Sequence, residues 1–320
     1  MAELERRPRA VRLPTPQAPE LPAAVSRARS LDRRAVALML VCCASWGLQQ
    51  ILAKLALAEV PPISQAAIRS LGGAIIVGGW AWWREPGIFR RDATLRPGII
   101  AGVLFAIEFL TLFVGLQWTS ASHAILFLYT APFFVALGAA FLLPNERLRP
   151  AQWFGLALSF VGVGMALRVS TEHGVMPLIG DLLTLAAGAF WGATTVLVKA
   201  TTLRLAPATK VLLYQLVISA VLLVMAALLA GERLPTEISF VPAMSLIYQV
   251  FWIAGVTFLA WFWLLRQYHS GELSAFTFLT PLLGVLAGHF LLGDTLEPGL
   301  LLAVALVLGG IILVNRRPPG

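Results

Sequence analysis

Two ionisable residues stand within segments of this sequence that are otherwise apolar. Arg69 and Glu108 each interrupt a stretch rich in Ala, Gly, Ile, Leu, Phe and Val. At the centre of a membrane-spanning helix, such a charge costs about 2.5–3.5 kcal/mol on insertion scales. If the two segments are neighbouring helices, Arg69 and Glu108 are offset along the helix axes by about 7 Å, which an arginine side chain can span. Three interpretations stay open: a structural ion pair, a Glu108 that meets a substrate amine or a translocated proton, or solvation by water that thins the bilayer.

A polar stripe within another apolar segment occurs twice. Trp46, Gln50 and Lys54 are spaced four residues apart and therefore share one face of a helix. The same spacing returns later in the chain, where it consists of Trp191, Thr195 and Lys199. In both copies a glycine follows the tryptophan. Either the tryptophans and the polar residues after them line a central cavity, or the tryptophans pack between two halves while the lysines extend to opposite membrane surfaces.

Further polar side chains within the apolar segments are candidates for the same route. They are Tyr129, Tyr214, Gln215 and Gln249. Because their polar atoms need partners inside a bundle of helices, we expect them near a solute pathway rather than on the lipid-facing surface. His123 begins another segment close to its outer end. We expect this histidine to be solvated.

Proline occurs inside two of the apolar segments, at Pro132 and Pro281. Each proline lacks the N–H group that would bond the carbonyl four residues earlier, at Leu128 and at Thr277. Both helices should therefore kink. Matching kinks in two halves either serve as gating hinges or reflect packing geometry alone.

Long apolar helices are the elements that must position these side chains. Hydrophobic residues make up 58% of the 320-residue chain and charged residues only 12%, about half the charged share of a soluble domain. About ten stretches are long enough to cross roughly 30 Å of hydrocarbon as helices. They lie near 35–56, 63–83, 98–118, 122–143, 151–168, 178–199, 207–230, 243–266, 273–292 and 298–315. The sequence predicts an all-α polytopic membrane protein with about ten transmembrane helices.

The distribution of charge predicts an orientation. The net charge is +8, and Lys and Arg concentrate in every second connection, starting with residues 1–34. By the positive-inside bias, both termini are cytoplasmic. Membrane orientation and contact with anionic lipids explain the excess of Lys and Arg. The net positive charge therefore does not indicate binding of nucleic acid. Residues 1–34 should be a disordered cytoplasmic tail, because an Arg/Pro-rich segment cannot bury a core.

The two halves of the chain share further landmarks in the same order. These are Pro62 with Pro207, Pro132 with Pro281, Glu146 with Asp294, Pro150 with Pro298, and Gly162 with Gly310. The order predicts a duplication, with one five-helix half over residues 35–170 and another over residues 178–317. An odd number of spans in each half gives the halves opposite orientations, which is the architecture of many carriers.

These landmarks resemble the EamA-type branch of the drug/metabolite transporter (DMT) superfamily, over residues 35 to 317. The matching features are Trp-Gly in the first helix of each repeat, Arg69 in the second helix, a proline in the fourth, an acidic residue after it and glycines in the fifth. The resemblance implies two inverted five-helix repeats, alternating access and a preference for export. The second half departs from the pattern at Tyr214, the counterpart of Arg69. The two halves are therefore expected to have different roles in the transport pathway.

Secondary transport of small metabolites across the plasma (inner) membrane is the function that these features favour. Amino acids or amphipathic aromatic compounds are the expected solutes, because the candidate side chains combine aromatic rings with amides. Coupling to protons through Glu108 and uniport both stay open, and no cofactor is expected. The sequence contains no H-E-x-x-H, G-x-S-x-G or P-loop motif, which disfavours a membrane enzyme or a nucleotide-driven pump. A lipid flippase or scramblase is the alternative.

Overall fold

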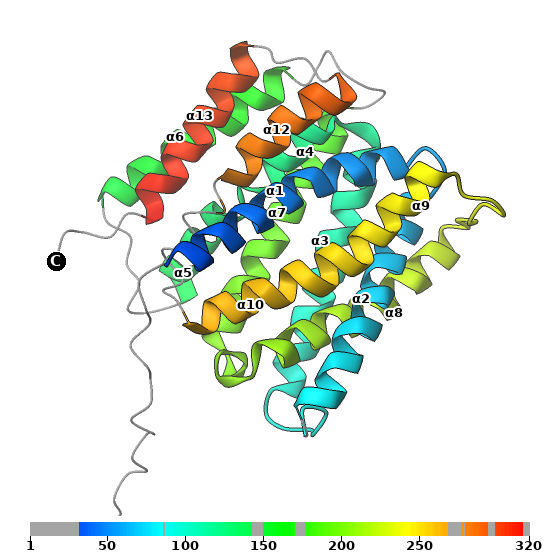
Figure 1. Ribbon diagram of the computed structural model, residues 1–320. Helices are drawn as coiled ribbons and strands as arrows, with labels where there is room; N and C mark the ends of the chain where they lie inside the picture. The colour runs from blue at the N-terminus through cyan, green and yellow to red at the C-terminus, as the bar shows by residue number, and fades with distance from the viewer. Residues whose placement is uncertain are drawn as a thin grey trace, which may run out of the picture.

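The computed structural model describes residues 32–85, 87–142, 150–169, 177–267, 277, 279–293 and 298–315 (Figure 1). In these ranges the chain is helical and contains no β-strand. Five helical stretches of the described part are long and apolar enough to cross a membrane. They are α1 (Arg33–Ala56), α3 (Leu95–Trp118), α7 (Pro177–Ala200), α8 (Ala208–Leu229) and the composite stretch Phe240–Trp261.

The remaining helices follow the other predicted segments. They are α2 (Pro62–Arg84), α4 (Ala121–Leu128), α5 (Ala131–Leu142), α6 (Pro150–Val169), α12 (Leu279–Leu292) and α13 (Pro298–Asn315), with the short 3₁₀ helix η2 (Thr202–Leu205) before α8. Helix α1 starts at Arg33, inside the predicted tail, because the side chain of Asp32 accepts a hydrogen bond from the backbone N–H of Ala35 at 2.8 Å. Residues 1–31, Glu146 and Asp294 lie outside the described residues.

Two predicted continuous helices are divided. The segment predicted over 122–143 turns at Tyr129 and Thr130, between α4 and α5 and just before Pro132, where the Thr130 hydroxyl donates to the Phe127 carbonyl at 2.6 Å. The segment predicted over 243–266 consists of α9 (Phe240–Ile247), the π-helix η3 (Tyr248–Thr257) and α10 (Phe258–Gln267). π-Helical turns are rare and occur frequently at functional sites.

The second predicted kink, at Pro281, falls beside a gap in the described residues. Residue 277 is helical and α12 is described from Leu279, but residues 271–276 and 278 lie outside the described ranges. The described residues therefore do not show where this helix begins, and the kink at Pro281 stays a prediction.

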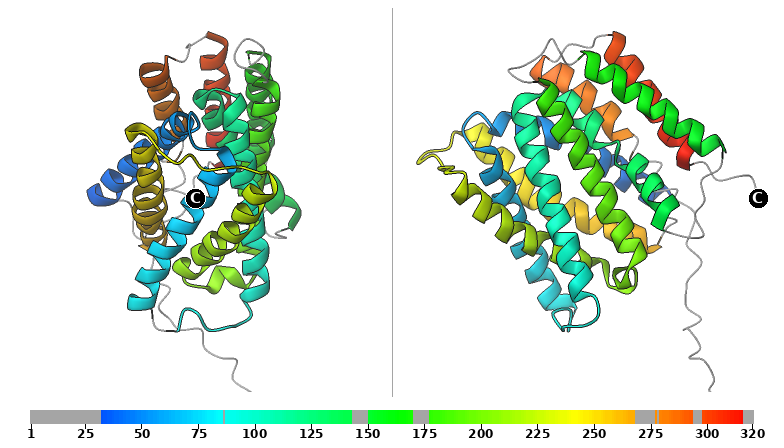
Figure 2. Two further views of the ribbon diagram at one scale, coloured as in Figure 1. Left: turned by 90° about the vertical axis from the view of Figure 1, so that its right-hand side faces the viewer. Right: turned by 180° about the vertical axis from the view of Figure 1, so that it is seen from behind.

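The major helix contacts join the first half of the chain to the second. Helix α3 packs against α7 and α8, α2 against α8, α1 against α12, and both α4 and α5 against α7. Helices α6 and α13 form a separate pair at one end of the molecule, as the views in Figures 1 and 2 agree. The largest apolar core lies among α1, α2, α3, α4 and α8.

Glycine allows several of these helices to approach closely. A Cβ atom on Gly47 would lie 3.0 Å from the backbone nitrogen of Gly284 in α12, and one on Gly192 would lie 2.6 Å from Cβ of Phe134 in α5. The glycines of the two Trp-Gly pairs therefore perform the same task, since each lets the first helix of its half contact a helix of the other half. A side chain at either position would force the helices apart.

Gly310 provides a direct test of this packing. A Cβ atom at Gly310 in α13 would overlap the backbone carbonyl of Gly155 in α6, whereas one at Gly79 in α2 would meet nothing within 4 Å. We expect Gly310→Ala to lower the free energy of unfolding by about 1–3 kcal/mol, the usual range for overpacking. Gly79→Ala should be neutral or stabilising, because alanine favours a helix over glycine by about 1 kcal/mol.

Thermal or denaturant unfolding of both variants in the same detergent checks this expectation. Equal stability of Gly310→Ala and Gly79→Ala would contradict the close packing of α6 on α13.

Candidate functional site

Arg69 lies in the interior of the helix bundle and does not pair with Glu108. Its side chain is only 1% exposed, and its guanidinium carbon lies 3.9 Å from the centre of the Phe109 ring and 5.3 Å from that of Phe258. Glu108 is also buried, but no ion pair joins it to Arg69. Of the three interpretations, the direct ion pair is therefore not formed in this structure, and the guanidinium lies over the ring of Phe109, the residue that follows Glu108. Such stacking is favourable for an arginine.

Buried polar atoms without a protein hydrogen-bond partner occur on α2 and on helices of the same bundle, and together they are called the polar cluster. Besides Nε and Nη1 of Arg69 and Oε2 of Glu108, it contains Gln50 Oε1, Gln65 Nε2, Ser70 Oγ, Gln249 Oε1 and Thr280 Oγ1. These atoms come from α1, α2, α3, η3 and α12, which pack against one another. A buried polar atom left unsatisfied costs about 1–3 kcal/mol, and more when it is charged. The bundle centre can therefore accept hydrogen bonds and charge from a polar solute.

The π-helix brings Gln249 into this cluster. The Gln249 Nε2 group donates to Gln65 Oε1 at 2.9 Å and to Ser245 Oγ at 3.1 Å, all in buried surroundings. This contact joins α2 of the first half to η3 of the second. Sequence reasoning selected Gln249, but it did not foresee the π-helical turn that carries it.

The two tryptophans of the repeated stripe have different partners. Trp46 donates through Nε1 to the Thr257 hydroxyl at 3.0 Å and packs edge-on against Trp261, with ring centres 5.6 Å apart. Trp191 packs edge-on against Tyr129 at 5.4 Å. Both tryptophans are half-buried. The partners of Trp46 lie in the second half of the chain, and the partner of Trp191 lies in the first. The Thr195 hydroxyl bonds the Trp191 carbonyl of its own helix at 3.0 Å.

The two lysines of the stripe also differ. Lys54 donates to the carbonyl oxygens of Leu116 and Thr119 at 2.6 and 2.7 Å, at the end of α3. These carbonyls lack helical partners, and the negative end of the helix dipole favours a cation there. Lys54 therefore caps α3 instead of extending freely to the surface. Lys199 is exposed, as the surface interpretation expects.

Tyr214 and Gln215 lie on α8, and Tyr214 belongs to a different region from Arg69. The Tyr214 hydroxyl lies 3.1 Å from the Thr94 hydroxyl, and its ring fills the space beside Gly98 at the start of α3. Glu108 is ten residues further along the same helix, about 15 Å away at 1.5 Å per residue. Gln215 is buried, at 9% exposure. The structure thus separates Tyr214 from the polar cluster.

Sequence reasoning was wrong about His123 and missed its partner. His123 is buried, and its Nδ1 lies 2.9 Å from Oδ2 of Asp181, which is fully buried in α7. The Thr119 hydroxyl donates to the other oxygen of Asp181. Asp181 stands near the start of an apolar segment, where it reads as an ordinary surface residue. Only the packing of α3 and α4 against α7 encloses both groups.

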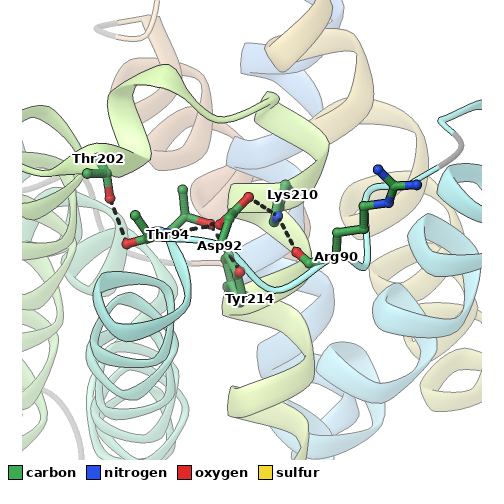
Figure 3. A network of polar contacts seen from close by, with 7 residues as sticks. Arg90, Asp92, Thr94, Thr202, Lys210 and Tyr214 are labelled. Carbon is green, nitrogen blue, oxygen red and sulfur yellow. Dashed lines mark hydrogen bonds and ion pairs between the residues drawn. The ribbon is translucent and has the colours of Figure 1, made fainter.

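A second polar network lies between α8 and the segment that joins α2 to α3 (Figure 3). Lys210 of α8 donates to Oδ2 of Asp92 at 2.7 Å and to the Arg90 carbonyl at 2.9 Å. Hydrogen bonds from Lys210 and from Thr94 lower the pKa of Asp92 from 3.8 to about 2. A pocket of about 500 Å³ opens beside this network, lined in part by Glu85, Thr202 and Pro207.

Comparison with known proteins gives a consistent family match. The EamA-like transporter family matches the chain over residues 33–168 and again over residues 178–316. The chain is 28% identical over 276 residues to the uncharacterized transporter YvbV of Bacillus subtilis, covering 85% of this chain and 88% of that protein. It is 27% identical over 296 residues to the "probable amino-acid metabolite efflux pump" of Salmonella typhimurium, covering 88% and 95% of the two chains.

Two further similarities extend the comparison. The riboflavin transporter of Rhizobium johnstonii is 28% identical over 211 residues, which cover 63% of this chain and 64% of that protein. A solved crystal structure aligns with a TM-score of 0.63 at 20% identity, covering 88% of this chain and 96% of the other. At this identity the structural similarity shows a shared fold alone.

Proposed function

Because the chain belongs to the EamA-like transporter family, it is a multi-pass membrane transporter of the DMT superfamily, and we propose that it exports zwitterionic amino acids or related amphipathic solutes. The proposed site is the buried polar cluster around Arg69 and Glu108. The observation that carries this proposal is that Arg69 and Glu108, an ionisable pair of opposite type, are buried inside the bundle with polar atoms that have no protein partner.

We propose ten transmembrane spans in two inverted repeats, over residues 35–170 and 178–317, with both termini cytoplasmic. In this arrangement α4 with α5 forms one span, and α9, η3 and α10 form another. The helix contacts support this arrangement. When each helix is replaced by the equivalent helix of the other half, one observed contact becomes another observed contact. Contact of α1 with α12 corresponds to contact of α7 with α4 and α5, and contact of α3 with α7 corresponds to contact of α1 with α9 and η3. Helix α2 contacts its own equivalent, α8, and helix α6 contacts its own equivalent, α13, so exchange of the halves leaves these two contacts unchanged.

The chemistry of the cluster supports a zwitterionic solute. An arginine with two free N–H groups is suited to a carboxylate, which it binds through paired, charge-assisted hydrogen bonds. A buried carboxylate is suited to an ammonium group. Because no direct ion pair joins Arg69 to Glu108, a solute that carries both charges can contact both side chains. Phe109 and Phe258 place apolar surface beside the guanidinium, which favours an amphipathic or aromatic side chain on that solute.

The direction and the solute class also draw on relatives. Two of the similar proteins, from Salmonella typhimurium and Escherichia coli, are named as amino-acid metabolite efflux pumps. In the proposed mechanism the halves rock about the cluster and expose it to each side in turn. The turn before Pro132 and the π-helix η3 are the places where the helices bend. Glu108 alternates between the solute ammonium and a proton, which couples export to the proton gradient.

Transport by the purified protein in sealed vesicles tests this function. Counterflow should be saturable for at least one amphipathic amino acid and should fall when that amino acid lacks either its carboxylate or its amine. Glu108→Gln should retain counterflow only at higher solute concentration, because the amide binds the solute ammonium more weakly than a carboxylate does. Net flux should lose its dependence on a proton gradient, because a neutral amide cannot exchange a proton. Expression and thermal unfolding of this variant should match the unsubstituted protein.

Absence of counterflow for every amino acid would overturn the proposal. Movement of fluorescent phospholipid between leaflets in the same vesicles would then indicate a flippase or scramblase instead. If Glu108→Gln lost exchange and stability together, the residue would be structural and proton coupling through it would be rejected.

A further inference from the structure

A glutamate from the second half binds the start of α2. Pro61 precedes this helix and provides no side-chain cap. Instead, Glu232 accepts hydrogen bonds from the backbone N–H groups of Ile63 at 3.1 Å and Ser64 at 2.6 Å, and from the Ser64 hydroxyl at 2.8 Å. A carboxylate in this place satisfies N–H groups that have no helical partner, and the helix dipole favours its charge. The loop after α8 is thereby held against α2.

A glutamate from the first half makes the corresponding contact at the start of α8. Pro207 precedes this helix and also provides no side-chain cap. The Thr209 hydroxyl donates to Oε1 of Glu85, which directly follows α2, at 2.8 Å. The loop between α2 and α3 is thereby held against α8.

The two contacts occupy corresponding places under exchange of the halves, although Glu232 accepts three hydrogen bonds and Glu85 accepts one. Ser64 follows Pro62 by two positions, just as Thr209 follows Pro207, and the two prolines are matching landmarks of the duplication. Each glutamate comes from the segment that follows the second helix of the opposite half. Helix α2 has 23 residues, so its ends lie about 34 Å apart, close to the thickness of the hydrocarbon core. The contacts therefore lie at opposite faces of the membrane.

Further polar contacts accompany each glutamate. At the face of the predicted cytoplasmic loops, Lys210 binds Asp92 and the Arg90 carbonyl, as Figure 3 shows. At the other face, the backbone N–H of Ser239 donates to Glu59 at 2.7 Å, which with the Ser239 hydroxyl lowers the pKa of Glu59. Both accompanying carboxylates therefore stay charged at neutral pH. Both ends of the α2–α8 pair are closed by hydrogen bonds between the halves in this structure.

We propose that the Glu232–Ser64 and Glu85–Thr209 contacts are matched latches that hold the outer and the inner gate. This inference rests on the proposed alternating access. A carrier must open one face while the other stays closed, so the latches break in alternation. Each latch lies where water can solvate its glutamate and the freed helix end, which makes it breakable. The two glutamates act as positioning residues, since neither contacts the proposed solute cluster.

Removing one latch should bias the protein toward opening at that face alone. The test uses two spin-label pairs in vesicles, with labels at Ala58 and Leu234 for the outer face and at Phe89 and Leu205 for the inner face. These four positions are solvent-exposed, and the native cysteines are replaced by alanine for labelling. Distances in each pair are measured by pulsed electron spin resonance, and solute counterflow is measured on the same preparations.

We expect Glu232→Ala to lengthen the outer distance and leave the inner one unchanged, while Glu85→Ala does the reverse. Loss of one charge-assisted contact should shift the ratio of open to closed protein by about tenfold or more, and counterflow should fall in both variants. The milder variants Ser64→Ala and Thr209→Ala should shift the same distances in the same directions. Glu237→Ala is the control, because Glu237 is exposed in the same loop as Glu232.

Two results would overturn the latches. One is unchanged distances in all four variants, and the other is a change at both faces from a single substitution, which would indicate a structural role alone. Failure of the proposed function would give a different result. The unsubstituted protein would then show no amino-acid counterflow, independently of the spin-label distances.

Discussion

Arg69→Gln is expected to weaken amino-acid binding by about two orders of magnitude and to abolish measurable export. The guanidinium is buried and offers two unpartnered N–H groups. Truncating one partner of a buried, hydrogen-bonded charge pair costs about 2–5 kcal/mol, which is roughly 30- to 4000-fold in affinity. Arg69→Lys keeps the charge but loses the planar fork, so it should bind the solute with intermediate affinity. Binding and counterflow titrations of the purified variants measure both effects.

Arg84→Gln is the matched control for this experiment. Arg84 ends the same helix and also lies over aromatic rings, at 4.4 Å from the centre of Trp83. It is exposed, however, and lies far from the polar cluster. Its replacement should leave counterflow unchanged. If Arg69→Gln retained the affinity of the unsubstituted protein, Arg69 would not bind the solute carboxylate.

His123→Ala is expected to lower the free energy of unfolding by about 3–5 kcal/mol, the usual result when one partner of a buried pair is removed. The substitution leaves Asp181 fully buried with the Thr119 hydroxyl as its remaining side-chain hydrogen bond. Replacing both partners with apolar residues of similar size, as in His123→Phe with Asp181→Leu, should restore much of the loss, because no charge then stays in the interior.

Unfolding measurements on the single and double variants separate these contributions. Thr119→Val provides a smaller reference, since it removes one hydrogen bond worth about 1 kcal/mol. A double variant as unstable as the sum of His123→Phe and Asp181→Leu, each measured alone, would show that His123 and Asp181 contribute independently. The pair would then not be the contact that joins α4 to α7.

Local pattern was enough to predict much of the fold. Long apolar stretches predicted the helices within a few residues, because hydrophobic length determines which segments can cross a bilayer. The duplicated landmarks predicted the family, which the family match confirms. Divided helices were less predictable. The turn at Tyr129 and Thr130 and the π-helix from Tyr248 to Thr257 occur inside long, mainly apolar segments that the sequence pattern predicts as continuous helices.

Side-chain partners were the least predictable feature of the candidate site. Arg69 and Glu108 were selected because a charge in an apolar segment is costly wherever it points. A direct ion pair was one of three interpretations left open, and the structure does not form it, since the guanidinium lies over Phe109 of α3. Lys54 was expected at a surface, yet the end of α3 reaches it. These outcomes depend on which helices become neighbours, and residue spacing within one segment does not contain that information.

By itself, the sequence determined that this chain is a membrane-spanning helical bundle with internal duplication, because those properties follow from local hydrophobicity and repeated residue order. Only the tertiary structure decided that His123 meets Asp181 and that Glu85 and Glu232 bind the starts of opposite helices. The physical reason is that hydrophobic burial is nearly independent of direction, whereas a hydrogen bond requires two atoms at a defined distance and angle. Packing between the halves is what sets those distances.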